Sequence, residues 1–188
     1  ARRPTHAGAV RTVEPMPPLR KNLMWLFGVV LAAMLETTWV EQIRLLDVVP
    51  NLTLLMVIYF AIIDGEERAM FTGAIGGVFQ DVASNEALGH HVFCNVIVGY
   101  AAARVASRMI TERPAAKAGL VFAAAIVFGL LSVGVAYIGD PRTPALHWIV
   151  ARVVPGAFYT ALVTPVMFFV LDRVFKRPRE WTLNKGAV

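Results

Sequence analysis

Charged residues are scarce in this chain. They make up 16% of its 188 residues, whereas soluble domains carry about 25%, so the charges are too few to cover a water-facing surface. Hydrophobic residues make up 57% of the sequence and form long runs between basic connectors, the pattern of a polytopic helical membrane protein. We therefore expect one all-α integral membrane domain. The net charge is +5, and the Lys and Arg residues lie at the ends of the expected helices. This placement favours membrane lipids over nucleic acid as partners.

Catalytic and metal-binding motifs are also missing. The single cysteine, Cys94, excludes an intrachain disulfide and a cysteine-based metal motif. His90 and His91 are adjacent and point about 100° apart on a helix, so they do not form the i, i+4 pair of a zinc helix. The sequence contains no Gly-x-Ser-x-Gly, His-Glu-x-x-His or phosphate-binding loop. We expect no enzymatic activity, no cofactor and no metal site.

Six apolar segments are predicted to be transmembrane helices. They cover residues 23–45, 50–63, 69–83, 87–106, 118–139 and 145–173. The fifth contains no charged residue and is the clearest span. The second and third are only about 20–23 Å long at helical rise, which is shorter than the ~30 Å hydrocarbon core. They either extend into flanking polar residues or lie within the bundle.

The distribution of basic residues predicts the orientation of these helices. Fifteen of the eighteen Lys and Arg residues fall on the side of the amino terminus, two (Arg44 and Arg142) fall on the opposite side, and Arg152 lies inside the sixth segment. The positive-inside rule therefore places both termini in the cytoplasm. Residues 1–22 and 176–188 are predicted to be cytoplasmic tails, the first of them flexible, and they flank a membrane domain at 23–175.

Three charged residues are predicted to lie at similar depth in the bilayer. Counting helical rise places Glu36 and Asp81 about 20 Å from the inner ends of their helices and Arg152 about 10 Å from an outer end. An unpaired charge at this depth is costly, so we hypothesise that Arg152 pairs with Glu36 or Asp81. This intramembrane polar belt could instead hold a ligand or proton, or contact a partner. His91 and Asn95 share a helix face and extend the polar seam.

Small residues and prolines indicate how the helices pack. Gly73, Gly77 and Gly99 give the third and fourth segments close-approach faces. These faces serve either packing within the bundle or docking of a foreign transmembrane helix. Pro155 and Pro165 are predicted to bend the sixth segment, because proline removes a backbone hydrogen bond.

An ordered set of motifs between residues 48 and 104 resembles the rod shape-determining MreD family. In order, the motifs are Pro50-Asn51-Leu52, Gly73, Gly76-Gly77, Gln80-Asp81, Leu88-Gly89-His90-His91 and Gly99-Tyr100. Asn51 departs from the acidic residue or histidine expected after the proline. The resemblance implies a partner-binding or structural core formed by Pro50, Gln80, Asp81, Leu88, Gly89, His91 and Tyr100.

The same resemblance implies a fold and a function. The fold would be a six-transmembrane-helix bundle similar to the substrate-binding subunits of energy-coupling-factor transporters. The function would be that of a non-enzymatic scaffold of the rod complex in the bacterial inner membrane. Its partner would be MreC, a single-span coiled-coil protein, with peptidoglycan synthases of the RodA and PBP2 types and MreB in the wider complex.

A different class of function remains open from the residues. The chain could be a small-molecule-binding subunit of an energy-coupling-factor-type transporter. In that case a polar cavity would be lined by Glu36, Asp81, His91, Asn95 and Arg152.

Overall fold

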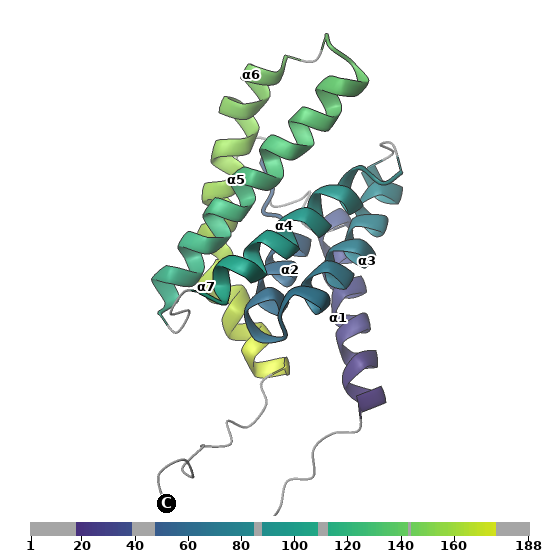
Figure 1. Cartoon of the computed structure of the whole chain (residues 1–188), viewed down its shortest axis with the longest axis vertical. Coiled ribbons are helices and arrows are strands. Elements are labelled where there is room, and N and C mark those ends of the chain that lie inside the picture. The colour runs from purple at the N-terminus through teal and green to yellow at the C-terminus, as the bar shows by residue number, and fades with distance from the viewer. Residues whose placement is uncertain (1–17, 39–47, 85–87, 109–112, 143, 176–188) are drawn as a thin grey trace, which may run out of the picture.

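The computed structural model describes residues 18–38, 48–84, 88–108, 113–142 and 144–175 (Figure 1). Every regular element in these ranges is helical: α1 (Pro18–Thr38), α2 (Leu52–Ile63), α3 (Glu66–Ser84), α4 (His90–Ala106), α5 (Pro114–Gly139), α6 (Ala145–Trp148), the π-helical turn η2 (Ile149–Val153) and α7 (Val154–Phe175). The last three form one continuous helix and match the predicted sixth segment. Helix α1 begins five residues before the predicted segment. Most of the two predicted tails and residues 39–45 of the first predicted segment lie outside the described residues.

Helix α2 is the central helix of the bundle. All residues from Thr53 to Ala61 are buried, because α1, α3, α4, α5 and α7 all pack against this helix. A helix that is apolar on every side is buried in protein or in lipid, and α2 is buried in protein. The Asn51 side chain caps its start by accepting a hydrogen bond from Leu54 N (2.6 Å). Gly65, at φ +88°, ends the helix by donating its N–H to Phe60 O, as in a left-handed C-cap.

The glycines of α3 and α4 are used within the bundle. A Cβ atom at Gly77 would lie 2.6 Å from Val92 N, and one at Gly73 would lie 2.8 Å from the carbonyl of Asn95. A Cβ atom at Gly99 would lie 3.1 Å from Ala69 O. These contacts let α3 and α4 form the most extensive helix pair. Internal packing, one of the two predicted uses of these glycines, is therefore the one that the structure supports.

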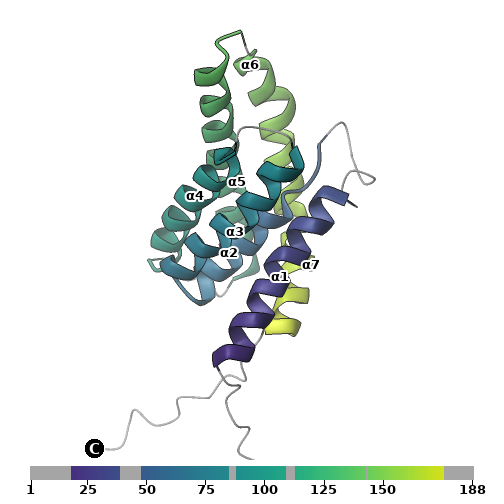
Figure 2. The same ribbon diagram turned by 90° about the vertical axis from the view of Figure 1, so that its right-hand side faces the viewer.

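Helix α5 and the continuous helix α6–η2–α7 form a hairpin that projects beyond the ends of α1–α4 (Figures 1 and 2). These are the two described helices that are long and apolar enough to cross a membrane, while α2 is apolar but shorter. The π-helical turn directly precedes Pro155. The proline ring crowds the carbonyl four residues earlier and offers it no N–H. The wider turn, closed by Val154 N to Ile149 O, accommodates that defect.

Candidate functional site

The Glu36 carboxylate joins three helices near one end of the bundle. Its Oε2 accepts hydrogen bonds from Thr53 N (2.8 Å) and Thr53 Oγ1 (2.6 Å) at the start of α2. Its Oε1 accepts a hydrogen bond from Gln80 Nε2 (2.9 Å) on α3. Three donors therefore satisfy this carboxylate without a cation. Because Thr53 lies in the first turn of α2, Glu36 also satisfies a helix-terminal N–H that has no intrahelical partner.

The Gln80 amide extends the hydrogen-bond network to α4. Its Oε1 accepts a hydrogen bond from Asn95 Nδ2 (2.7 Å), and Asn95 is fully buried. The other side-chain atom, Asn95 Oδ1, has no hydrogen-bond partner among the described residues. Glu36, Gln80 and Asn95 thus form a continuous polar contact across α1, α3 and α4.

Asp81 caps the start of α4 from the neighbouring helix. Its Oδ2 accepts from Gly89 N (2.8 Å), and its Oδ1 accepts from His91 N (2.7 Å) and contacts His91 Nδ1 at 2.9 Å. The Asp81 side chain is fully buried. A carboxylate at a helix N-terminus satisfies backbone donors and is favoured by the helix dipole. Gly89 adopts φ +100°, a conformation that glycine takes without strain and that brings its N–H to Asp81.

Two further hydrogen bonds attach the α5–α7 hairpin at the same end. His90 Nε2 lies 2.7 Å from Ser132 Oγ on α5. Asn51 N donates to Thr160 Oγ1 (3.2 Å) on α7. Neither hydroxyl residue was predicted from the sequence. Thr160 is one of several hydroxyl residues in its segment, and nothing in the sequence indicates which helix Ser132 contacts.

The hypothesised ion pair of Arg152 is wrong for both proposed partners. Neither Glu36 nor Asp81 forms a salt bridge with Arg152 among the described residues; the Arg152 guanidinium instead lies 5.3 Å from the centre of the Trp148 ring. Equal depth in a membrane does not fix the direction in which a side chain points. Neutral N–H, O–H and amide donors already satisfy Glu36, and Asp81 is satisfied by backbone N–H groups and His91.

The residues predicted as a structural core fall into two groups. Pro50, Gln80 and Asp81 are buried, and Gly89 and His91 join Asp81 through the contacts described above. Leu88 and Tyr100 lie apart from this network, and both are exposed. The Arg104 guanidinium carbon lies over the Tyr100 ring, 5.2 Å from the centre of that ring.

Charged side chains gather at the opposite end of the bundle. Lys21 Nζ and Arg68 Nε lie 3.4 and 3.7 Å from the Asp64 carboxylate. Tyr59 donates its hydroxyl hydrogen to Asp172 Oδ1 (3.2 Å). Trp25 Nε1 donates to Thr72 Oγ1 (2.9 Å), beneath the Arg68 guanidinium. These pairs lie at the end that the charge distribution predicts to be cytoplasmic, where aromatic and basic side chains are favoured at the membrane interface.

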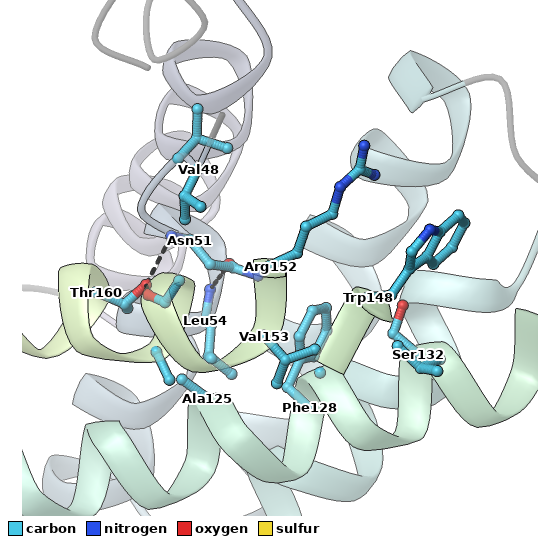
Figure 3. A pocket seen from close by; sticks show the side chains of 15 residues that line it. Val48, Asn51, Leu54, Ala125, Phe128, Ser132, Trp148, Arg152, Val153 and Thr160 are labelled. Atoms are coloured by element: carbon cyan, nitrogen blue, oxygen red, sulfur yellow. Dashed lines mark hydrogen bonds between the residues drawn. The ribbon is translucent and has the colours of Figure 1, made fainter. Parts of the chain in front are cut away.

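A cavity of about 450 Å³ lies between the start of α2, helix α5 and the π-helical turn. Its polar lining comes from Asn51, Ser132, Trp148, Arg152 and Thr160, and its apolar lining includes Leu54 and Phe128. Figure 3 shows these side chains rising from the facing helices. Five residues were predicted to line a polar cavity. Arg152 lines the cavity described here, whereas Glu36, Asp81, His91 and Asn95 are not among its lining residues.

Comparison with known proteins identifies the family. The family model described as rod shape-determining protein MreD matches residues 19–177. The match includes the motif-bearing region at 48–104 and extends over almost all of the described helices, so it confirms the resemblance seen in the sequence. Neither the curated proteins nor the solved structures give a match, and the likeness to energy-coupling-factor subunits stays a prediction. The chain belongs to the MreD family of rod shape-determining proteins.

Proposed function

We propose that this chain is a non-enzymatic membrane scaffold of the bacterial cell-elongation complex. Membership of a family of rod shape-determining proteins supports a role in the control of cell shape. The interhelical network carries the proposal of mechanism, because Glu36, Gln80 and Asp81 direct their polar atoms to neighbouring helices. A helix bundle held in this way offers fixed outer faces to other membrane proteins. The positive-inside pattern supports a multi-pass arrangement in the inner membrane with both termini cytoplasmic.

The partner that we propose is a single-span coiled-coil protein of the MreC type. The glycine faces of α3 and α4 are occupied by internal packing, so they are not offered to a foreign helix. Helix α6–η2–α7 presents a long stripe of exposed apolar residues at every fourth position. The stripe consists of Val150, Val154, Phe158, Leu162, Val166, Val170 and Val174. Neighbouring members such as Phe158 and Leu162 lie on one helix face, whereas the stripe as a whole winds around the axis by about 40° per step. An inclined stripe of this kind suits a partner helix that crosses α7 at an angle. We place the partner span on this stripe.

The scaffold would act by positioning. Holding the membrane span of an MreC-type protein would fix where its extracytoplasmic part emerges, and so where synthases of the RodA and PBP2 types work. Linkage to MreB would follow through the wider complex. This mechanism requires contact surfaces and no reaction at the network residues.

Site-specific photocrosslinking tests the proposed contact. A photoreactive amino acid replaces Phe158 or Leu162 on the α7 stripe of the full chain, co-expressed with the MreC-type protein of the same organism. The matched control carries it at Phe27 on α1, which is equally exposed. We expect a crosslinked product from the α7 positions and none from Phe27. Crosslinking from Phe27 alone would move the interface to α1, and no product at any position would contradict direct binding of this partner.

A further inference from the structure

We propose that the cavity between α2, α5 and the π-helical turn binds the phosphate-bearing headgroup of an anionic membrane lipid. The ligand phosphate would sit beside the Arg152 guanidinium, and the acyl chains would follow the apolar wall formed by residues such as Val153 and Phe128. This assignment concerns the inner face of helix α6–η2–α7 and does not depend on the partner proposed for its outer face.

Arg152 and Trp148 supply the polar mouth of the cavity. Arg152 is exposed and stacks over Trp148, and among residues 18–38, 48–84, 88–108, 113–142 and 144–175 it has no salt-bridge partner. Counted from Ala145, Arg152 lies about 10 Å along the helix axis. Arginine at this depth is favoured when it reaches an anionic group at the membrane interface, and a guanidinium binds a phosphate through two parallel N–H···O bonds.

Neutral donors and an apolar wall complete the site. Asn51 uses its Oδ1 to cap α2, so the group that it can offer to a ligand is its Nδ2 donor. Trp148 can offer its indole N–H. Val153 and Phe128 are half-buried apolar lining residues suited to a hydrocarbon chain. Figure 3 shows Arg152 and Trp148 on one helix, with Phe128 and Ser132 on the facing helix α5. A volume of about 450 Å³ lies in the range of small-molecule sites.

The backbone builds this site through its π-helical turn. The cavity-lining positions Trp148, Arg152, Gly156 and Thr160 recur every fourth residue. The exposed apolar stripe that includes Val150 and Val154 is offset from them by two residues, which is the opposite face of a helix. Arg152 lies within the wide turn at Ile149–Val153, directly before the regular helix α7. π-Helical turns of this kind are frequent at functional sites.

Native mass spectrometry of the full chain tests the proposal. The protein, purified in detergent, is titrated with phosphatidylglycerol and with zwitterionic phosphatidylcholine. We expect phosphatidylglycerol to bind more tightly, and Arg152→Gln to lower its affinity about tenfold by removing a charge-assisted contact. The Arg152→Lys variant keeps the charge but loses the second parallel hydrogen bond, so its affinity should lie between those of Arg152→Gln and the unaltered chain. The control is Arg142→Gln, which removes an exposed arginine outside the lining and should leave the affinity unchanged.

Three outcomes would overturn the proposal. Equal phosphatidylglycerol affinity in Arg152→Gln and the unaltered chain would exclude this cavity as the site. An equal loss in Arg142→Gln would show that net surface charge, rather than the cavity, attracts the lipid. Glycerol 3-phosphate, added as a soluble competitor, distinguishes the two sources of phosphate. Displacement of the lipid at equal concentration would make the ligand a free phosphate ester, whereas poor competition supports a lipid whose chains contribute to binding.

Discussion

Helices α1–α4 and the α5–α7 hairpin are held together in different ways. Within α1–α4, hydrogen bonds accepted by Glu36 and Asp81 and relayed through Gln80 connect the helices, and glycines bring α3 and α4 into close contact. The hairpin joins this group through apolar side chains and three hydroxyl contacts, His90–Ser132 and Asn51–Thr160 at one end and Tyr59–Asp172 at the other. A cavity remains between the two parts. The first part is fixed by directional bonds, whereas the second is attached mainly by packing.

This difference suits a scaffold with one rigid part and one binding part. Hydrogen bonds have preferred distances and angles, so they fix how α1–α4 lie against each other. Apolar packing is non-directional and tolerates a π-helical turn, a cavity and a bound lipid. The exposed stripe that we propose for the partner and the cavity that we propose for the lipid both belong to the hairpin.

The largest effect is expected from Asp81→Leu. This change leaves Gly89 N, His91 N and His91 Nδ1 without the buried carboxylate that they contact. An unsatisfied buried donor costs about 1–3 kcal/mol; these three contacts are partly buried, so the free energy of unfolding should fall by about 3 kcal/mol in total. Equilibrium unfolding in mixed detergent micelles measures this loss. The control is Asp140→Asn at an exposed position, and equal stability of the two variants would contradict a capping role for Asp81.

Two glycine-to-alanine substitutions separate the effect of close packing on stability from the effect of helix propensity. Gly77→Ala places a Cβ 2.6 Å from Val92 N, whereas Gly134→Ala meets nothing within 4 Å. Overpacking of the first kind costs about 1–3 kcal/mol. Alanine in an open helical position gains up to about 1 kcal/mol over glycine. The same unfolding measurement should therefore give opposite signs, and a neutral Gly77→Ala would show that α3 and α4 are not tightly fitted there.

The Gln80–Asn95 contact provides a test of coupling. Gln80→Leu and Asn95→Leu should each destabilise the chain by about 1–2 kcal/mol, because each leaves a buried polar group without its partner. The double variant removes both groups and should cost less than the sum of the two single changes. A strictly additive double-mutant cycle would mean that the 2.7 Å contact contributes nothing of its own.

The smallest effect is expected at the junction with the hairpin. Ser132→Ala removes one hydroxyl contact to His90 in a part of the molecule held mainly by packing. The free energy of unfolding should fall by about 1 kcal/mol or less. A loss as large as that of Asp81→Leu would contradict the distinction between the two parts.

The sequence predicts the helices better than their contacts. Apolar runs located α2 and α6–η2–α7 to within a few residues, because burial in lipid or in the bundle requires continuous apolar stretches. Proline near residue 155 predicted a bend, and the structure has a π-helical turn there. The depth of Glu36 and Asp81 was derived from helical rise, but the direction of their side chains was not. That direction depends on how each helix is rotated about its axis, and three-dimensional packing sets this rotation.

The pairing of Arg152 illustrates this limit. Charge and depth alone favoured a carboxylate partner. The structure satisfies Glu36 with Thr53 and Gln80, and it orients Arg152 toward Trp148. Donors such as Thr53 N are backbone atoms at the start of a helix, and the type of residue in the sequence does not indicate that they will bind a carboxylate. Sequence patterns identified the polar residues at depth but could not specify their partners.

Affinity purification of the tagged full chain from its native membranes in mild detergent, followed by mass spectrometry of the co-purifying proteins, tests the scaffold proposal most directly. We expect recovery of a single-span coiled-coil protein of the MreC type, with or without peptidoglycan synthases. Recovery of ATPases and a coupling subunit in its place would contradict the scaffold and make this chain a transport subunit.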